Sequence, residues 1–538
     1  MTDFKKYGVD NAIILAAGSG TRLAPLTYET PKGLIKVKGK PMIERQIEQL
    51  LEVGITEIFV VIGYLKEQFA YLVEKYGVHL VENPEFAVKN NFVSLYYARE
   101  HLKNTYLLMA DNWIEDNLFH THEPHSWFSG IYFDHPCAEW EAVLDADDRI
   151  IRLESSLATP GWTIVGPAFL SEEFSFSLRP LLEDYYQRPS ADDYYWEHLI
   201  LENPQAFEWF INRAGNDNVH EFETFAELCA YDPSHLVETT NPSLQTIATV
   251  FSAPIGAITA IEPLKVGMTN LSFLFTLGGQ TYVFRQPGPG TEKLIDRQQE
   301  KRAYELLESL DLTDEVCYFD GVSGQKIAPF YPDARISDPE NDEDLRQGMR
   351  ALKRLHDAAI PAPGRFEVAT KTDFYEGLLL ELAPVPFADY EATKQKMRRL
   401  VAWRDRLAVP EVLCHGDFAH VNVLHLDDGK VRIIDWEYSG GGDPIMDISC
   451  YSIFAYFSRE RLDLALRFYL DREPTREETG RLYLYAALCG FLWSIWGEYK
   501  QACGSDFGDY TQIQHRYATD YYTLLEELGY LAEVEGEK

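Results

Sequence analysis

The chain has 538 residues, several times the ~100–200 residues of one typical domain, so we expect two or three hydrophobic cores. Apolar residues make up 46% and charged residues 25%, which excludes a disordered or fibrous protein. The 85 acidic residues outnumber the 49 basic ones, and the formal net charge is −36. A surface of this sign repels phosphate backbones and anionic lipids, so we expect small-molecule partners and no nucleic acid.

The cysteines and the N-terminus indicate a reducing compartment. The seven cysteines are scattered and form no CxxC motif, which predicts no zinc site. The N-terminal MTDFKKYGVD lacks the apolar core of a signal peptide. The uncharged run at 239–261 is rich in Thr, Ser and Pro, and the apolar run at 483–497 is shorter than the ~20 residues that span a bilayer. We predict a soluble, cytoplasmic protein without a membrane span.

The first 110 residues alternate apolar runs with amphipathic stretches. We predict strands at residues 11–17, 58–62, 78–81 and 106–110, and helices at 41–53 and 66–76. Strands separated by helices in this way favour a mainly parallel, doubly wound sheet. Such sheets bind ligands where their strands end.

The pattern changes after residue 231. Residues 232–254 are rich in Pro, Ser and Thr, which predicts a linker. Strands at 272–277 and 280–285 form a predicted hairpin joined at Gly278-Gly279, a helix follows at 295–307, and apolar helices fill the rest. We therefore predict an α/β chain with a Rossmann-like domain at 1–231, a linker at 232–254 and a bilobal domain at 255–538.

A dense polar motif follows the first predicted strand. It begins with Leu15-Ala16-Ala17-Gly18-Ser19-Gly20, and Arg22 and Lys32 come next. Glycines after a strand let backbone N–H groups face a polyphosphate, and the two cations can neutralise the β- and γ-phosphates of a nucleotide. The glycine loop alone would also suit a structural turn. The loop and the cations together predict a nucleoside triphosphate site that is neither a Walker A loop nor a dinucleotide fingerprint.

Residues 10–231 resemble the sugar-phosphate nucleotidyltransferases, specifically the bacterial CTP:phosphocholine cytidylyltransferases of the Lic type. The resemblance includes the strings TPKGLIKVKGKPMIERQIEQL, KNNFVSLYYARE and LLMADNW. It implies that Asp111 binds Mg²⁺, and that Glu221 and Glu223 match a late acidic string in which Glu223 has a longer arm than the usual Asp. It also implies that three polar residues lie near the nucleotide or substrate: Asn90, Asn91 and Ser94.

The resemblance extends to an aromatic group that would bind choline. Choline is a quaternary ammonium without hydrogen-bond donors, so a protein encloses it in aromatic faces with a carboxylate nearby. The residues that match the family here are Trp140, Tyr195, Trp196 and Glu197. From composition alone, these aromatic residues would equally suit a hydrophobic core.

A second motif, His415-Gly416-Asp417 with Asn422 and Asp435, fits the HxDxxxxN pattern of phosphoryl transfer from ATP. It supplies Asp417 as the base for a substrate hydroxyl, and Asn422 and Asp435 as Mg²⁺ ligands. Upstream lie residues that we predict to contact the phosphates, namely Thr269, Asn270, Ser272 and Arg285, with Glu300 holding the arginine. For Arg285 and Glu300 the alternative is an ordinary surface pair.

Residues 255–525 resemble the choline kinase branch of the aminoglycoside-phosphotransferase and protein-kinase-like fold. The resemblance includes IEPLKVGMTNLSFLF, DWEY and FLWSIWGEYKQACGSDFGDY. It implies that the choline pocket is lined by Glu437, Tyr438, Trp493 and Trp496, for which core packing is the alternative. The catalytic loop departs from the family at His420 and Val421, which concerns substrate detail and not the type of reaction.

Together these resemblances imply two consecutive reactions. The C-terminal half would phosphorylate choline with ATP, and the N-terminal half would join phosphocholine to CTP with release of pyrophosphate, both with Mg²⁺. The nearest alternative has the same chemistry on ethanolamine, phosphoethanolamine or 2-aminoethylphosphonate. Sugar-1-phosphate nucleotidylation and a scaffold with degenerate enzyme domains are further alternatives. The sequence leaves the oligomeric state open, a homodimer included.

Overall fold

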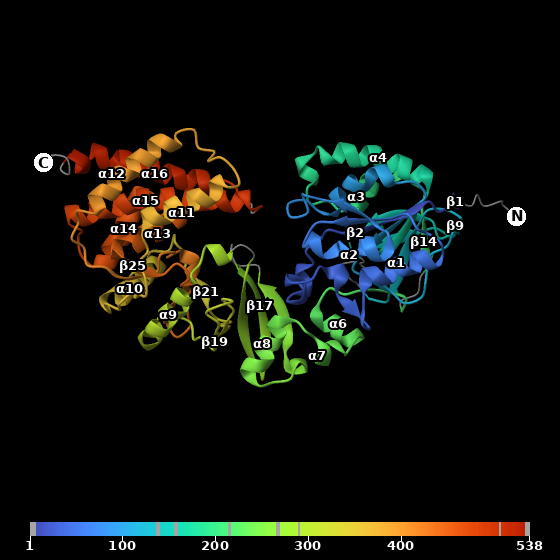
Figure 1. Ribbon diagram of the computed structural model, residues 1–538, viewed down its shortest axis with the longest axis horizontal. Coiled ribbons are helices and arrows are strands. Elements are labelled where there is room, and N and C mark those ends of the chain that lie inside the picture. The colour runs from blue at the N-terminus through green and yellow to red at the C-terminus, as the bar shows by residue number, and fades with distance from the viewer. Residues whose placement is uncertain are drawn as a thin grey trace. The chain divides into compact units, whose positions relative to one another are not determined.

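The computed structural model describes residues 7–135, 140–154, 156, 160–213, 217–264, 270–288, 291–504 and 507–532 (Figure 1). The chain divides into two compact units. One unit contains Met1–Lys265 and Phe273–Gly279, and the other contains Val266–Ser272 and Gln280–Lys538. Each unit has hydrophobic core clusters of its own.

Within the described residues, a nine-stranded mixed sheet forms the centre of the first unit. Its parallel part has the order β7–β2–β5–β6, with bounds Thr105–Met109, Asn11–Ala16, Ile58–Ile62 and His79–Glu82. These are the four predicted strands, so the parallel arrangement of the first 110 residues is confirmed. The rest of the sheet, for which the sequence analysis predicted no strands, is β10 (Trp127–Phe133), β11 (Glu141–Leu144), β12 (Ile150–Glu154), β13 (Gly161–Leu170) and β14 (Phe210–Arg213).

Helices cover both faces of this sheet. Ala12 and Ile14 of β2 belong to one core and Ile13 and Leu15 to the other, because side chains alternate along a strand. The first core includes residues of α1 (Met42–Glu52), and the second includes residues of α3 (Asn91–Ala98), α4 (Glu172–Tyr186) and α5 (Trp196–Glu202). The predicted helix at 66–76 is a 3₁₀ turn at Lys66–Phe69 followed by α2 (Tyr71–Tyr76).

The predicted linker at 232–254 contains helical structure. It holds α7 (His235–Glu238) and α8 (Pro242–Phe251), which follow α6 (Phe225–Tyr231). The side chain of Asn241 caps α8, and Pro242 occupies the first helical turn, where its missing N–H is tolerated. Proline and hydroxyl-containing residues therefore mark a helix start here.

A five-stranded sheet follows within the described residues, in the order β16–β17–β18–β20–β19. Its strands span Thr259–Leu264, Asn270–Leu277, Gln280–Pro287, Lys326–Pro329 and Tyr318–Phe319. The predicted hairpin is confirmed, and Gly278 and Gly279 both have positive φ, which glycine adopts without steric cost. The predicted helix at 295–307 is α9 (Arg297–Leu307).

The remaining residues are mainly helical. The helices are α10 (Asp342–Asp357), α11 (Val368–Leu380), α12 (Tyr390–Arg404), α13 (Pro444–Phe454), α14 (Arg459–Leu470), α15 (Arg476–Ala502) and α16 (Tyr510–Glu527). Helix α15 is buried throughout residues 480–500 and packs against α11, α13 and α16, which explains its apolar run (Figure 1). Among the described residues, no helix is long and apolar enough to cross a membrane.

Candidate active sites

The first site lies at the carboxyl end of the parallel strands. The loop after β2 and the ends of β6 and β7 border a cavity of about 780 Å³. Gly20 has φ +58°, and an added Cβ would lie 2.9 Å from Cβ of Lys32, so glycine is required at this point. All of the predicted loop residues line the cavity: Leu15, Ala16, Ala17, Gly18, Ser19, Gly20, Arg22 and Lys32.

Three carboxylates surround Lys32 in this cavity. Strand β8 (Asn112–Ile114) pairs with β15 (Val219–Glu221), which brings Asp111 next to Glu221 and Glu223. Lys32 Nζ lies 2.8 Å from Asp111 Oδ2, 3.2 Å from Glu223 Oε1 and 3.7 Å from Glu221 Oε1. Arg22 forms an ion pair with Glu223.

The electrostatics of this cluster favour a bound cation. Burial alone would lower the pKa of Lys32, but the three carboxylates outweigh burial and raise it. Burial and the neighbouring Asp111 raise the pKa of Glu221. The three carboxylates lie around Lys32 Nζ, and carboxylate oxygens are the ligands that Mg²⁺ prefers, so the residue types fit the predicted metal.

The other end of the cavity is aromatic. Trp140, Tyr195 and Glu197 line it. The Trp140 ring meets His198 edge-on with centroids 4.9 Å apart, and Tyr195 stacks on the same imidazole at 5.9 Å. Burial raises the pKa of Glu197 to about 7.

Trp196 does not belong to this group, and its prediction as a substrate-contacting residue is wrong. Its side chain has no exposed surface and stacks on Phe128 in the core, with ring centroids 5.3 Å apart. It is the first residue of α5, where successive side chains diverge by about 100° around the helix axis, so Tyr195 and Glu197 face the cavity while Trp196 faces inward.

The predicted polar residues next to the loop are also in the cavity wall. Asn90 caps α3, and its Nδ2 donates to the carbonyl of Asp193. Asn91 Oδ1 accepts from the backbone N–H of Trp196, and Ser94 accepts from Asn83 Nδ2 at 3.0 Å. These bonds hold α3 and α5 at fixed positions on one side of the cavity.

The second site is built on the loop that carries the HxDxxxxN motif. Residues 415–422 connect β22 (Val412–Cys414) to β23 (Val423–His425), and β24 (Val431–Ile433) leads to Asp435, which has φ +67°. Asn422 Nδ2 donates to the backbone carbonyl of Asp417 at 3.0 Å and lies 3.5 Å from its carboxylate. Burial, and then the neighbouring Asp435, raises the pKa of Asp417 well above its ordinary range.

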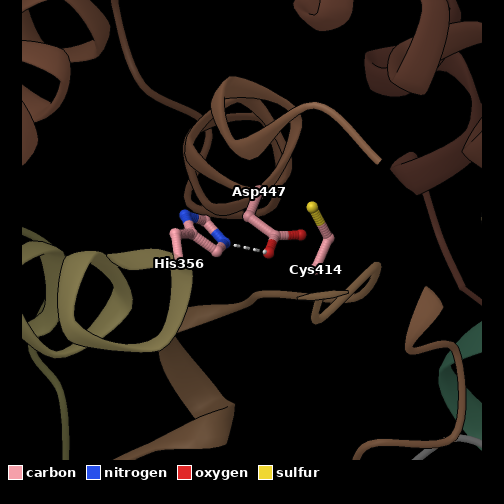
Figure 2. A group of neighbouring side chains, drawn as sticks. All are labelled: His356, Cys414 and Asp447. Carbon is pink, nitrogen blue, oxygen red and sulfur yellow. Dashed lines mark hydrogen bonds and ion pairs between the residues drawn. The ribbon is translucent and has the colours of Figure 1, made fainter. Parts of the chain in front are cut away.

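A buried cluster of His356, Cys414 and Asp447 lies beneath this loop (Figure 2). Asp447 accepts hydrogen bonds from the backbone N–H groups of His415 and Gly416 at 2.7 and 2.9 Å, and from His356 Nε2 at 3.1 Å. Burial raises the pKa of the Cys414 thiol well above its ordinary range. With both carboxylate oxygens bonded to the backbone and a protonated thiol, this cluster anchors the catalytic loop and does not suit a metal.

The nucleotide end of the second site contains buried ion pairs. Arg285 pairs with Glu300, lies 3.5 Å from Asp435 Oδ1, and donates to the carbonyl of Gly324 at 3.0 Å. Arg285 is 5% exposed and Glu300 is fully buried, so the alternative of a surface pair is wrong. Ser272 is buried in β17, and Asn270 Nδ2 lies 3.4 Å from Glu437 Oε2. The predicted Thr269 lies outside the described residues.

The acceptor end is a group of packed rings. Tyr438 meets Trp493 edge-on at 5.2 Å, and Trp493 meets Trp496 at 5.6 Å. Both tryptophans are 2% exposed and belong to the hydrophobic core of the second unit, as the core-packing alternative expects, so their contact with choline stays a prediction. The fourth predicted residue, Glu437, lies with its carboxylate 3.0 Å from Arg297 Nη1, and burial together with the neighbouring Asp435 raises its pKa to about 7.

Comparisons with known proteins agree with this division. Residues 12–111 match the model of the MobA-like NTP transferase domain, and residues 260–483 match that of the phosphotransferase enzyme family. The chain is 37% identical over 215 residues to choline-phosphate cytidylyltransferase of Streptococcus pneumoniae, which covers 40% of this chain and 93% of that protein. It is 36% identical over 230 residues to 2-aminoethylphosphonate cytidylyltransferase of Lancefieldella rimae, covering 42% and 93%.

The N-terminal part of the chain belongs to the cytidylyltransferase family of these two relatives. The chain is also 29% identical over 273 residues to protein LicA of Haemophilus influenzae, which covers 48% of this chain and all of that protein. The predicted fold class is confirmed: a nucleotidyltransferase domain precedes a kinase-like phosphotransferase domain. Both are transferase domains, so the chain is an enzyme.

Two residues of this cytidylyltransferase-family chain escaped the sequence analysis. Asn83 directly follows β6 and lines the first cavity, and a polar residue at the end of a parallel strand is a signal that could have identified it. Arg297 lies three residues before Glu300, the spacing at which helical side chains meet. Nothing in the local sequence indicates its second partner, Glu437, which lies 140 positions away.

Proposed function

We propose that this chain makes CDP-choline in two steps, with the phosphotransferase at residues 255–538 and the cytidylyltransferase at 1–231. The first step transfers the γ-phosphoryl group of ATP to choline. The second transfers CMP from CTP to phosphocholine and releases pyrophosphate. The observation that carries the proposal is that each half holds a largely buried cation paired with carboxylates, together with aromatic rings.

In the cytidylyltransferase site, the backbone of residues 17–20 faces the triphosphate, and Arg22 and Lys32 neutralise it. Asp111, Glu221 and Glu223 would hold Mg²⁺, which when bound neutralises charge on the phosphates. The phosphate of phosphocholine attacks the α-phosphorus of CTP in line with the leaving pyrophosphate. Positioning and charge neutralisation supply the catalysis, so no covalent intermediate on the enzyme is needed.

In the phosphotransferase site, Asp417 accepts the hydroxyl proton of choline as the oxygen attacks the γ-phosphorus. Its raised pKa makes its carboxylate a stronger base than an exposed one. Arg285 binds the α- and β-phosphates, and Asn270 and Ser272 border them. Asn422 and Asp435 would hold Mg²⁺, which supplies the same neutralisation here.

The aromatic ends favour choline over the alternative substrates. A primary ammonium needs acceptors for three N–H groups, whereas a trimethylammonium group needs none and gains from ring faces. Trp140 and Tyr195 line the first cavity, and Trp493, Trp496 and Tyr438 cluster in the second site. Glu437, the carboxylate next to Tyr438, is paired with Arg297 and is therefore a weak acceptor for an ammonium.

Incubation of the protein with choline, ATP, CTP and Mg²⁺ tests the proposal. We expect CDP-choline and pyrophosphate in the complete mixture, phosphocholine alone when CTP is omitted, and no product when ATP is omitted. Added phosphocholine should restore CDP-choline without ATP. Turnover of ethanolamine or 2-aminoethylphosphonate in preference to choline or phosphocholine would overturn the substrate assignment.

A further inference from the structure

Arg297 occupies a buried position between two carboxylates of the phosphotransferase site. It is the first residue of α9, and 6% of its side chain is exposed. Its Nη1 lies 2.9 Å from Glu300 Oε2 and 3.0 Å from Glu437 Oε2. One guanidinium nitrogen therefore connects helix α9 to the segment that carries Asp435.

These contacts form a chain of alternating charges. Arg285 pairs with Glu300 Oε1, Arg297 pairs with Glu300 Oε2, and Arg297 also pairs with Glu437. The four residues are 5%, 0%, 7% and 7% exposed in the order Arg285, Glu300, Arg297 and Glu437. Asp435 also lies 3.5 Å from Arg285 Nη1, so two arginines face three carboxylates, and removing one arginine would leave buried negative charge without compensation.

The turn at Gly324 holds both arginines. Gly324 has φ +75°, and an added Cβ would lie 2.6 Å from Arg297 Nε and 2.7 Å from its Cδ. The carbonyl of the same glycine accepts from Arg285 Nη2 at 3.0 Å. Arg297 also donates to Thr291 Oγ1 at 3.4 Å. These contacts fix where the guanidinium of Arg297 lies.

We propose that Arg297 is a positioning residue for phosphoryl transfer, because it compensates Glu300 and Glu437 and so leaves Arg285 available to the nucleotide phosphates. This inference rests on the proposed phosphotransferase function. Without Arg297, both carboxylates compete for Arg285, whose Nη1 already contacts Glu300 and lies 3.5 Å from Asp435. The arginine would then be drawn away from the α- and β-phosphates, and ATP binding would weaken.

The test uses the full-length protein with Arg297→Met, Arg297→Lys and the double variant Arg297→Met/Glu437→Gln. Arg302→Met is the matched control, because Arg302 lies on the same helix with 60% of its side chain exposed. The readouts are the Kd of a fluorescent ATP analogue measured without acceptor, KM for ATP and for choline, the melting temperature, and CMP transfer to added phosphocholine.

We expect Arg297→Met to weaken nucleotide binding about tenfold, the loss of one charge-assisted interaction, and to change KM for choline less than KM for ATP. Arg297→Lys should lose less, and the double variant should recover part of the loss because it removes one carboxylate together with the cation. Arg302→Met should match the wild type.

Unchanged nucleotide affinity in Arg297→Met would contradict the proposal. So would equal losses in KM for ATP and choline with no recovery in the double variant, because that pattern is expected of a purely structural residue. Nucleotide binding is measured without choline, so it can be compared between variants whether or not choline is phosphorylated. If the wild type does not phosphorylate choline, the proposed function is refuted, and the nucleotide-binding result still tests the role of Arg297.

Discussion

The two proposed nucleotide sites combine the same residue types, a cation with carboxylates, but differ in how far those residues are buried. In the cytidylyltransferase site, the side chains of Asp111, Glu221 and Glu223 are 25%, 38% and 28% exposed around Lys32. In the phosphotransferase site, those of Glu300 and Glu437 are 0% and 2% exposed. Water can stabilise an unbalanced cluster in the first site. In the second site the charged side chains are shielded from water, so they need partners within the protein, and Arg297 is one of these partners.

The aromatic residues of the two sites also differ in exposure, and those of the phosphotransferase site are again the more buried. Tyr195 is 39% exposed at the edge of an open cavity, whereas Trp493 and Trp496 are 2% exposed. An open aromatic wall suits phosphocholine, whose phosphate must reach the α-phosphorus of CTP. A closed group of rings suits choline, whose only reacting atom is its hydroxyl oxygen. Variants that affect one site and not the other test whether the comparison holds.

The largest effects should come from the reacting groups themselves. Asp417→Asn removes the base, and we expect choline phosphorylation to fall by about 10³-fold while CMP transfer to added phosphocholine is unchanged. Asp111→Ala should do the reverse, with a loss of about 10²–10³-fold in CMP transfer. Separate assays of ADP and pyrophosphate release measure the two reactions.

Each variant serves as the other's control, because both reactions are measured on one preparation. A variant that loses both activities while its melting temperature matches the wild type would show that the sites do not act independently.

How far these sites could be predicted depends on whether a residue's partners are close in sequence. The loop at residues 15–20 and the HxDxxxxN motif are continuous strings whose chemistry follows from the residues themselves, and their positions at strand ends follow from the parallel sheet. Strands β11 and β12 of the first sheet were missed, because they contain fewer buried apolar residues than β2 and β5.

Side-chain direction was the harder problem. Trp196 and Glu197 are adjacent, yet one is in the core and the other lines the cavity, because the direction of each depends on where α5 begins. Ion-pair partners depend on the folded chain: Lys32 and Glu223 are 191 positions apart. Composition cannot supply either fact, whereas the hairpin at Gly278-Gly279 was predictable because both of its strands are local.

Substitutions of Trp196 in the core and Trp140 in the cavity wall should have effects of intermediate size, the first on stability and the second on substrate binding. Trp196→Ala removes a fully buried ring stacked on Phe128, and we expect it to lower the free energy of unfolding by about 3–5 kcal/mol. Trp140→Ala, at the half-buried cavity wall, should destabilise the protein much less and raise KM for phosphocholine about tenfold. Urea denaturation and CMP-transfer kinetics measure the two quantities.

An effect of Trp196→Ala on substrate binding instead of stability would mean that Trp196 contacts the substrate. If Trp196→Ala raised KM for phosphocholine at unchanged stability, its indole would have to leave the core and reach the cavity. Trp196→Phe is the matched variant, because it keeps an aromatic ring against Phe128 and should recover most of the lost stability.

The smallest expected effect concerns pH. Burial raises the pKa of Glu197 to about 7, so this carboxyl is mostly neutral at pH 6 and mostly charged at pH 8. The charged form attracts the trimethylammonium group, and we expect KM for phosphocholine to fall by about three- to tenfold between these values. For stability the sign is opposite. The folded protein binds more protons than the unfolded chain between about pH 4.5 and 7, so stability decreases as pH rises through that window.

Phosphocholine carries its own titrating phosphate, with a pKa of about 6, so the pH profile of the wild type contains two contributions. Glu197→Gln keeps the size of the side chain and removes its titration, and the profile that it retains is the contribution of the substrate. Identical profiles in the wild type and in Glu197→Gln would mean that the carboxyl does not face the ammonium group. A steeper dependence in the wild type alone would place the counter-charge of the open site on Glu197, whose carboxylate lines the cavity, whereas Glu437 of the closed site lies 3.0 Å from Arg297.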